Sequence, residues 1–216
     1  MTEKELYAPR LHNIEFLRIL FTFCIFACHA LTSFYHANNG FFAVEFFFIL
    51  SGFFLYYTID NQKNVQTFML KKIIRFLPLM LFGQVVCDLI SLKFRFQNYI
   101  SLAFFLPSTG LTDLNYHSVG GVWYVCVLLW ISVFYFYLIK TQPLKTVNLL
   151  IGIVTFVSLI VYNNCDNRTA NWLFPSSLLR GLVCIGIGYF LALICKENNL
   201  LPPPTHIKKT GTKTKC

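Results

Sequence analysis

Long apolar stretches recur along the chain and constrain its fold more than any other feature. A helix needs about 20 mostly apolar residues to cross the hydrocarbon layer of a bilayer, which is about 30 Å thick. Of the 216 residues, 56% are hydrophobic and only 12% are charged, whereas soluble domains carry about 25% charged residues. The sequence therefore predicts an all-α fold, a polytopic transmembrane helical bundle.

Six stretches are candidate membrane spans, and a shorter apolar segment interrupts the series. The spans run from about Ile14 to Ser33, Phe41 to Ile59, Leu77 to Ser91, Val122 to Ile139, Val147 to Tyr162 and Trp172 to Ile194. Tyr99 to Leu106 is too short to cross and is predicted to be re-entrant or interfacial. The membrane domain is expected over residues 1–196, followed by a disordered basic cytoplasmic tail over 197–216 that contains three consecutive prolines.

The basic residues predict how the bundle is oriented, because cytoplasmic loops are enriched in Lys and Arg. Placing the N-terminus inside leaves only Lys93, Arg95 and Arg168 on the outer side and thirteen basic residues in the cytoplasm. Both termini are therefore expected to be cytoplasmic. The protein itself is expected in the cell (inner) membrane. The formal net charge of +9 is spread between spans, which favours membrane lipid as a partner and argues against nucleic acid.

The eight cysteines predict neither a metal site nor a disulfide framework. Six of them fall within or at the ends of apolar stretches, and the sequence has no Cys-x-x-Cys pair and no Cys/His ligand spacing. They are expected to be small apolar core residues.

Charged and titratable residues inside the spans are the first candidates for function, because burying them in a bilayer is costly. Arg18 and His29 lie eleven positions apart, which places them on nearly the same face of one helix, about 16 Å apart along its axis. Arg18 is expected near the cytoplasmic end and His29 in the outer half. Glu45 begins the second span at a depth where it can contact His29. Asp88 and Arg180 are expected near the same level.

A basic cluster of Lys71, Lys72 and Arg75 directly precedes Pro78, which is expected to open the third helix. Arg18 is expected at a comparable depth. Guanidinium and ammonium groups in this place could hold a phosphorylated ligand that arrives from the cytosol.

Simpler interpretations stay open at each of these positions. The lysines of the basic cluster can act only as topology determinants, and Arg18 can extend to the lipid headgroups. His29 can be a hydrogen-bonding residue in helix packing. Glu45 and Asp88 can face water at the outer interface. The functional interpretation rests on the combination of these residues.

Four local motifs occur in a specific order. The first string contains Arg18 and His29, and the second contains Glu45; in order the strings are IEFLRILFTFCIFACHA, FFAVEFFFILSGFFLYY, FMLKKIIRFLPLM and GGVWYVCVLLW. Together they resemble the acyltransferase-3 family of integral-membrane O-acyltransferases, with its R/K-x10-H signature on the first helix. The resemblance covers about residues 13–139, and the rest matches only in hydropathy.

Two departures from the family pattern stand out. Lys72 occupies the first position of the family's R-x-x-R element, and Arg75 occupies the second. Family members generally have about ten spans, whereas this chain has about six.

The resemblance implies transfer of a small acyl group, with acetyl expected, from cytosolic acyl-CoA to a hydroxyl of an extracytoplasmic glycan or lipid-linked sugar. This reaction would be an O-acetylation of cell-envelope polysaccharide, with acetyl-CoA as the donor and no metal. Arg18, Lys72 and Arg75 are expected to bind the phosphates of the donor.

The same resemblance suggests the catalytic residues. His29 is expected to act as general base or transient acyl acceptor, and Glu45 to orient its imidazole. Ser51 is a second candidate nucleophile, although a serine beside Gly52 can also serve only in helix packing.

Two alternative functions belong to other classes. A transporter or flippase of a charged or lipid-linked solute would use the same intramembrane charges, but the sequence shows no internal repeat. A truncated, inactive remnant is the other alternative. If acceptor-binding elements are missing from one chain, a second copy could supply them in a homo-oligomer.

Overall fold

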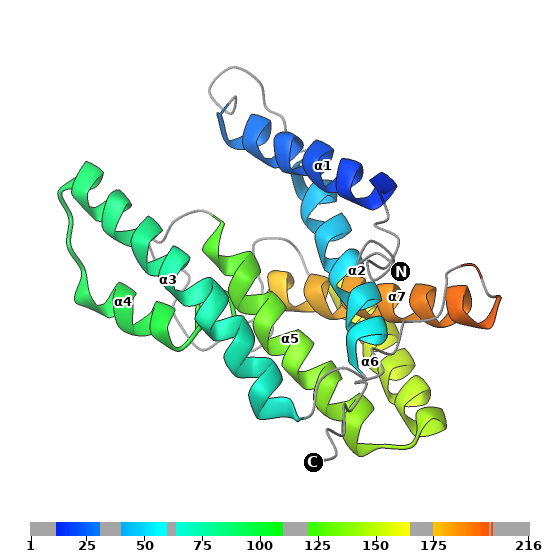
Figure 1. Ribbon diagram of the computed structural model, residues 1–216. Coiled ribbons are helices and arrows are strands. Elements are labelled where there is room, and N and C mark those ends of the chain that lie inside the picture. Colours follow the sequence, from blue (N-terminus) through cyan, green and yellow to red (C-terminus); the bar gives the residue numbers. More distant parts are fainter. Residues whose placement is uncertain are drawn as a thin grey trace, which may run out of the picture.

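The computed structural model describes residues 12–30, 40–59, 64–109, 121–164, 175–198 and 200, without the side chains of residues 12, 13, 29, 30, 40 and 41. These residues form seven helices and no strand (Figure 1). The helices are α1 (His12–Ala30), α2 (Gly40–Thr58), α3 (Val65–Ser91), α4 (Phe96–Ala103), α5 (Val122–Thr141), α6 (Leu144–Asn164) and α7 (Ser176–Glu197).

Each of the six predicted spans overlaps one long helix, which confirms the predicted all-α bundle. Within the described residues, α3, α5, α6 and α7 are long and apolar enough to cross a membrane. In α2, the stretch Phe42–Thr58 is apolar but shorter. The predicted short segment forms α4, which has 8 residues and is therefore about 12 Å long. Of the tail predicted over residues 197–216, Glu197 belongs to α7, and residues 199 and 201–216 lie outside the described residues.

The prediction that Pro78 opens the third helix is wrong. α3 begins at Val65 and contains Pro78 in its interior. Membrane helices accept an internal proline because neighbouring groups satisfy the backbone carbonyl that it leaves unpaired. The charges of the basic cluster lower the local hydropathy, so the hydropathy pattern did not predict the first three turns of α3.

The main core lies where α2, α5, α6 and α7 meet (Figure 1). Phe48, Tyr135, Ile185 and Tyr189 are fully buried there. The Tyr135 hydroxyl donates a 2.9 Å hydrogen bond to the carbonyl of Leu182 in α7. Buried tyrosine hydroxyls generally need such a partner, so this contact fixes α5 against α7.

Two glycines let α2 and α7 touch backbone to backbone. A β-carbon added at Gly52 of α2 would clash with the carbonyl of Ile185, and one added at Gly188 of α7 would clash with the carbonyl of Ile49. Small residues at such contacts are typical of membrane helices, whose association depends on close packing. Gly52 and Gly188 therefore fix the distance between these two helices.

The remaining helices surround this core less tightly. α3 and α4 pack against α5 through a second apolar cluster that contains Met80, Leu102 and Cys126. α1 lies at the edge of the molecule and packs mainly against α2 (Figure 1).

Candidate active site

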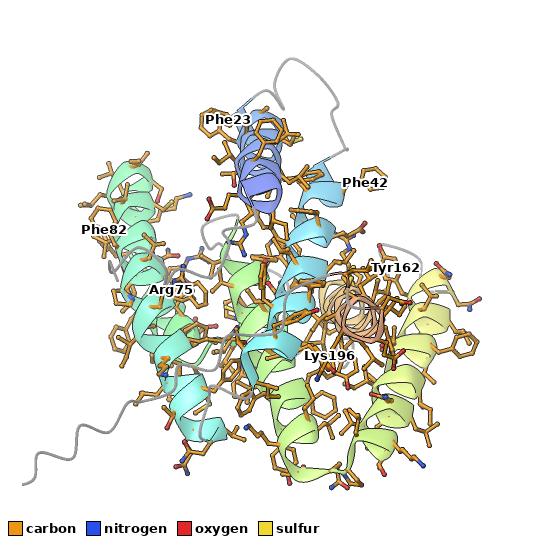
Figure 2. The ribbon with its side chains drawn as sticks, turned by 45° about the vertical axis from the view of Figure 1, so that its right-hand side comes forward. Phe23, Phe42, Arg75, Phe82, Tyr162 and Lys196 are labelled. Carbon is orange, nitrogen blue, oxygen red and sulfur yellow. The ribbon has the colours of Figure 1, made fainter. Side chains whose placement is uncertain are left out.

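A cavity of about 440 Å³ lies between α1, α2, α3 and α5. Arg18 of α1 and Lys72 and Arg75 of α3 line it, and Ser51 of α2 contributes a hydroxyl group. Arg75 lies about midway along α3 (Figure 2). Most of the remaining wall is apolar and includes Phe47, Phe54, Phe68 and Phe76. The structure thus brings together the three residues predicted to bind phosphate, with Ser51 in the same wall.

Helical spacing brings Lys72 and Arg75 to the cavity, because residues three or four positions apart share one face. Lys72 Nζ lies 5.0 Å from the centroid of the Phe68 ring and donates a 3.3 Å hydrogen bond to Ser132 Oγ of α5. Arg75 Cζ lies 5.7 Å from the centroid of the Phe76 ring. The faces of these rings stabilise the two cations.

Arg18 reaches the cavity from α1. Its Cζ lies 5.0 Å from the centroid of the Phe54 ring of α2. Further along α1, Phe21 stacks on Phe46 with ring centroids 4.3 Å apart. These two aromatic contacts hold α1 against α2 with the guanidinium directed at the cavity, although the Arg18 side chain remains exposed.

Ser51 and Gly52 have different neighbours, although they are adjacent in the sequence. Gly52 makes the close contact with α7, whereas Ser51 lines the cavity. The Ser51 hydroxyl donates a 2.7 Å hydrogen bond to the carbonyl of Phe47. The Tyr124 side chain of α5 also forms a hydrogen bond with the Ser51 side chain.

Glu45 pairs with Arg180 of α7, with 3.5 Å between Glu45 Oε1 and Arg180 Nε. The Arg180 side chain is 12% exposed and that of Glu45 is 31% exposed. Arg180 Nη2 also donates a 3.1 Å hydrogen bond to the hydroxyl of Tyr162, near the end of α6 (Figure 2). The expected proximity of Glu45 and Arg180 is thus found in the structure.

His29 lies in the last turn of α1, and its side chain is outside the described residues. Its expected contact with Glu45 therefore stays a prediction.

Asp88 lies in the last two turns of α3, where α4 packs against this helix. Its carboxylate is 3% exposed and accepts hydrogen bonds from Gln84 in α3 and Tyr99 in α4. That Asp88 lies at the level of Glu45 and Arg180 therefore stays a prediction, while its described partners come from α3 and α4.

Sequence reasoning also missed Ser132, which accepts the hydrogen bond from Lys72. These residues are separated by 60 positions, and no local motif links them. The four phenylalanines of the cavity wall could not be predicted as lining residues either, because the chain contains 24 phenylalanines.

Long apolar helices around a cavity lined by three cations define a polytopic membrane protein with a basic site inside its helical bundle. A family model described as an acyltransferase domain, Acyl_transf_3, matches residues 11–203. The chain therefore belongs to the acyltransferase-3 family, as its motifs predict. No curated protein and no solved structure gives a significant match.

Proposed function

We propose that the protein is a membrane O-acyltransferase that moves an acyl group, acetyl by preference, from cytosolic acyl-CoA to a hydroxyl of an extracytoplasmic glycan or lipid-linked sugar. The observation that carries this proposal is the convergence of Arg18, Lys72 and Arg75 on one cavity that also contains Ser51. With both termini in the cytoplasm, this cavity opens toward the compartment that supplies the donor.

The chemistry of the cavity suits a coenzyme A thioester. Coenzyme A carries a pyrophosphate and a further phosphate, and guanidinium groups bind phosphate through paired hydrogen bonds. Lys72 adds a point charge, which is less directional than a second guanidinium. The aromatic wall offers apolar surface to the rest of the donor.

In the proposed reaction, the acceptor hydroxyl attacks the thioester carbonyl, so that a C–O bond forms and the C–S bond breaks. His29 takes the hydroxyl proton and returns it to the departing sulfur, which leaves as the free thiol. Glu45 orients the imidazole, and Arg180 holds the Glu45 carboxylate in place. In the variant of this scheme with an acyl-enzyme, His29 or Ser51 accepts the acyl group before the acceptor does.

His29→Ala is expected to abolish detectable acyl transfer, because general-base assistance contributes about 10² to 10⁴ in rate. The measurement is transfer of labelled acetyl groups from acetyl-CoA to surface glycan in membranes that contain the variant. Acetyl-CoA binding should persist, because the cations of the cavity are unchanged. Wild-type levels of O-acetylated glycan in this variant would contradict the role given to His29.

Lys72→Gln is expected to weaken acetyl-CoA binding by about 10- to 100-fold, because a hydrogen bond to a charged group contributes about 1.5 to 3 kcal/mol. Titration calorimetry of the purified protein in detergent measures the effect. Lys71→Gln is the matched control, since it removes the neighbouring charge, which is not part of the cavity wall.

Equal losses in the two lysine variants would mean that the cavity gives no specific contact to the donor. Solute uptake by reconstituted vesicles without any requirement for acyl-CoA would instead support a transporter.

A further inference from the structure

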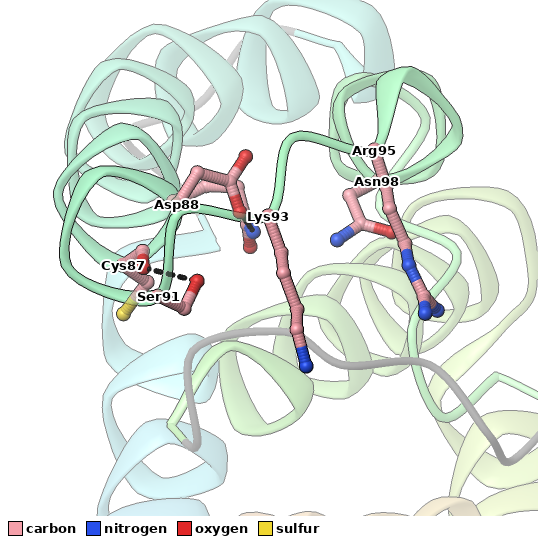
Figure 3. A pocket seen from close by; sticks show the side chains of 7 residues that line it. Cys87, Asp88, Ser91, Lys93, Arg95 and Asn98 are labelled. Carbon is pink, nitrogen blue, oxygen red and sulfur yellow. Dashed lines mark hydrogen bonds between the residues drawn. The ribbon is translucent and has the colours of Figure 1, made fainter.

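A second polar cleft lies at the other end of α3, where the proposed reaction uses no residue. It has a volume of about 370 Å³ and is formed by the last two turns of α3, the linker after it and the first turn of α4 (Figure 3). Lys72 and Asp88 are separated by sixteen positions on α3, or about 24 Å along its axis. The cleft and the basic cavity therefore lie near opposite faces of a bilayer.

The floor of the cleft is a buried polar network. Gln84, Asp88 and Asn98 line it and are 1%, 3% and 4% exposed, respectively. Gln84 Nε2 donates a 2.8 Å hydrogen bond to Asp88 Oδ1, and the Tyr99 hydroxyl donates a 2.6 Å bond to Asp88 Oδ2. The bond to Asp88 also raises the pKa of Tyr99, so this phenol remains a donor at physiological pH.

One hydrogen-bond acceptor in this floor has no donor among the described residues. Gln84 Oε1 is buried and accepts no hydrogen bond from the described residues. An unsatisfied buried carbonyl is unfavourable, and such groups call for a partner. A ligand hydroxyl at the base of the cleft would provide the missing donor.

The mouth of the cleft is positively charged. The chain reverses after α3 at Leu92, which has a φ of 51°, and the linker then presents Lys93 and Arg95. Both side chains are exposed and extend in a similar direction from the backbone (Figure 3). Two cations separated by one residue suit a phosphate group.

The surroundings of the mouth are apolar, which distinguishes it from a site for a soluble anion. The exposed side chains that alternate with and follow the two cations are large and hydrophobic: Leu92, Phe94, Phe96, Ile100 and Phe104. At the end of a membrane helix, such residues lie among lipid acyl chains while neighbouring cations meet the headgroups.

We propose that this cleft binds the headgroup of an anionic phospholipid that carries free hydroxyls, of the phosphatidylglycerol type. The phosphate lies between Lys93 and Arg95, a headgroup hydroxyl donates to Gln84 Oε1, and the acyl chains run along Phe94 and Phe96. This lipid site goes beyond the proposed acyl transfer and does not depend on it.

Native mass spectrometry of the purified protein with added lipids tests the proposal. The wild type should retain phosphatidylglycerol more strongly than phosphatidylmethanol, which is anionic but lacks free hydroxyls, and should retain phosphatidylcholine least. The K93Q/R95Q variant should bind both anionic lipids about 25-fold more weakly, because each cation near a phosphate contributes about a factor of five.

Two further variants separate charge from hydrogen bonding. The K140Q/K145Q variant removes the same charge at the other end of the bundle and should bind like the wild type. Gln84→Met should keep the preference for anionic lipids but lose the preference for phosphatidylglycerol over phosphatidylmethanol.

Three results would overturn the lipid site. One is wild-type retention of anionic lipids by K93Q/R95Q. Another is an equal loss in K140Q/K145Q, which would indicate general charge attraction. The third is displacement of phosphatidylglycerol by an equal concentration of water-soluble glycerol phosphate, which would make the cleft a site for a soluble anion. Acetyl-CoA binding by K93Q/R95Q should match the wild type in every case, so the failure of this proposal is separate from that of acyl transfer.

Discussion

The ion pair between Glu45 and Arg180 joins the second helix of the chain to the last one. The Arg180 side chain is largely buried and that of Glu45 is partly buried, and Arg180 also has the Tyr162 hydroxyl as a partner. Removing one member of such a pair leaves the other charge poorly compensated. The pair is therefore expected to matter for stability as well as for the proposed orientation of His29.

A double-mutant cycle of Glu45→Ala and Arg180→Met should give a coupling energy of about 0.5–3 kcal/mol, because the two groups are in direct contact. Thermal or denaturant unfolding of the four proteins in detergent measures it. Strictly additive effects of the two substitutions would show that the contact contributes nothing to stability.

Local motifs predicted which residues line the cavity better than they predicted the hydrogen-bond partners of functional residues. Arg18, Ser51 and the pair of Lys72 and Arg75 could be selected from the sequence, because each belongs to a motif that lies within a single helix. The hydrogen bond from Lys72 to Ser132 could not be predicted, since it depends on how two distant helices are placed. The hydrogen bond from Tyr99 to Asp88 could not be predicted for the same reason.

Among the helices, α2 and α7 are the most closely joined. Their contact depends on the absence of a β-carbon at Gly52 and Gly188. The hydropathy pattern does not predict this role for either glycine. The lengths and order of the spans were predictable from apolar runs, whereas the start of α3 was not, because charged residues that line a cavity resemble a loop in composition.

Gly52→Val is expected to destabilise the folded protein by about 1–3 kcal/mol or more, because the new side chain meets a backbone carbonyl that cannot move aside easily. Gly152→Ala on α6 is the control, since its β-carbon would meet only Phe190 at an ordinary 3.6 Å. Unfolding in detergent compares the two. A Gly52 variant as stable as the control would mean that α2 and α7 are not in backbone contact.

For the whole molecule, the basic cavity beside the first half of α3 and the polar cleft at its last two turns are expected to face opposite compartments. The fold class and the family were predictable, because both follow from apolar periodicity and from motifs of a few residues. The position of α4 over the end of α3 was not, since eight residues carry too little periodicity to define their contacts.

Cysteine labelling tests this arrangement in a background without the exposed native cysteines. A membrane-impermeant maleimide applied to intact cells should label Lys93→Cys, while Lys145→Cys should react only after permeabilisation. Labelling of both positions from the same side would contradict the proposed orientation.

The backbone contact between α2 and α7 also limits how the basic cavity can change shape. Ser51 lines the side of the cavity formed by α2, and α2 is in backbone contact with α7 at the neighbouring Gly52. This side of the cavity therefore cannot move outward. A donor that needs more room than the resting cavity offers must gain it by displacing α3, or by swinging α1 outward on the ring contacts that tie it to α2.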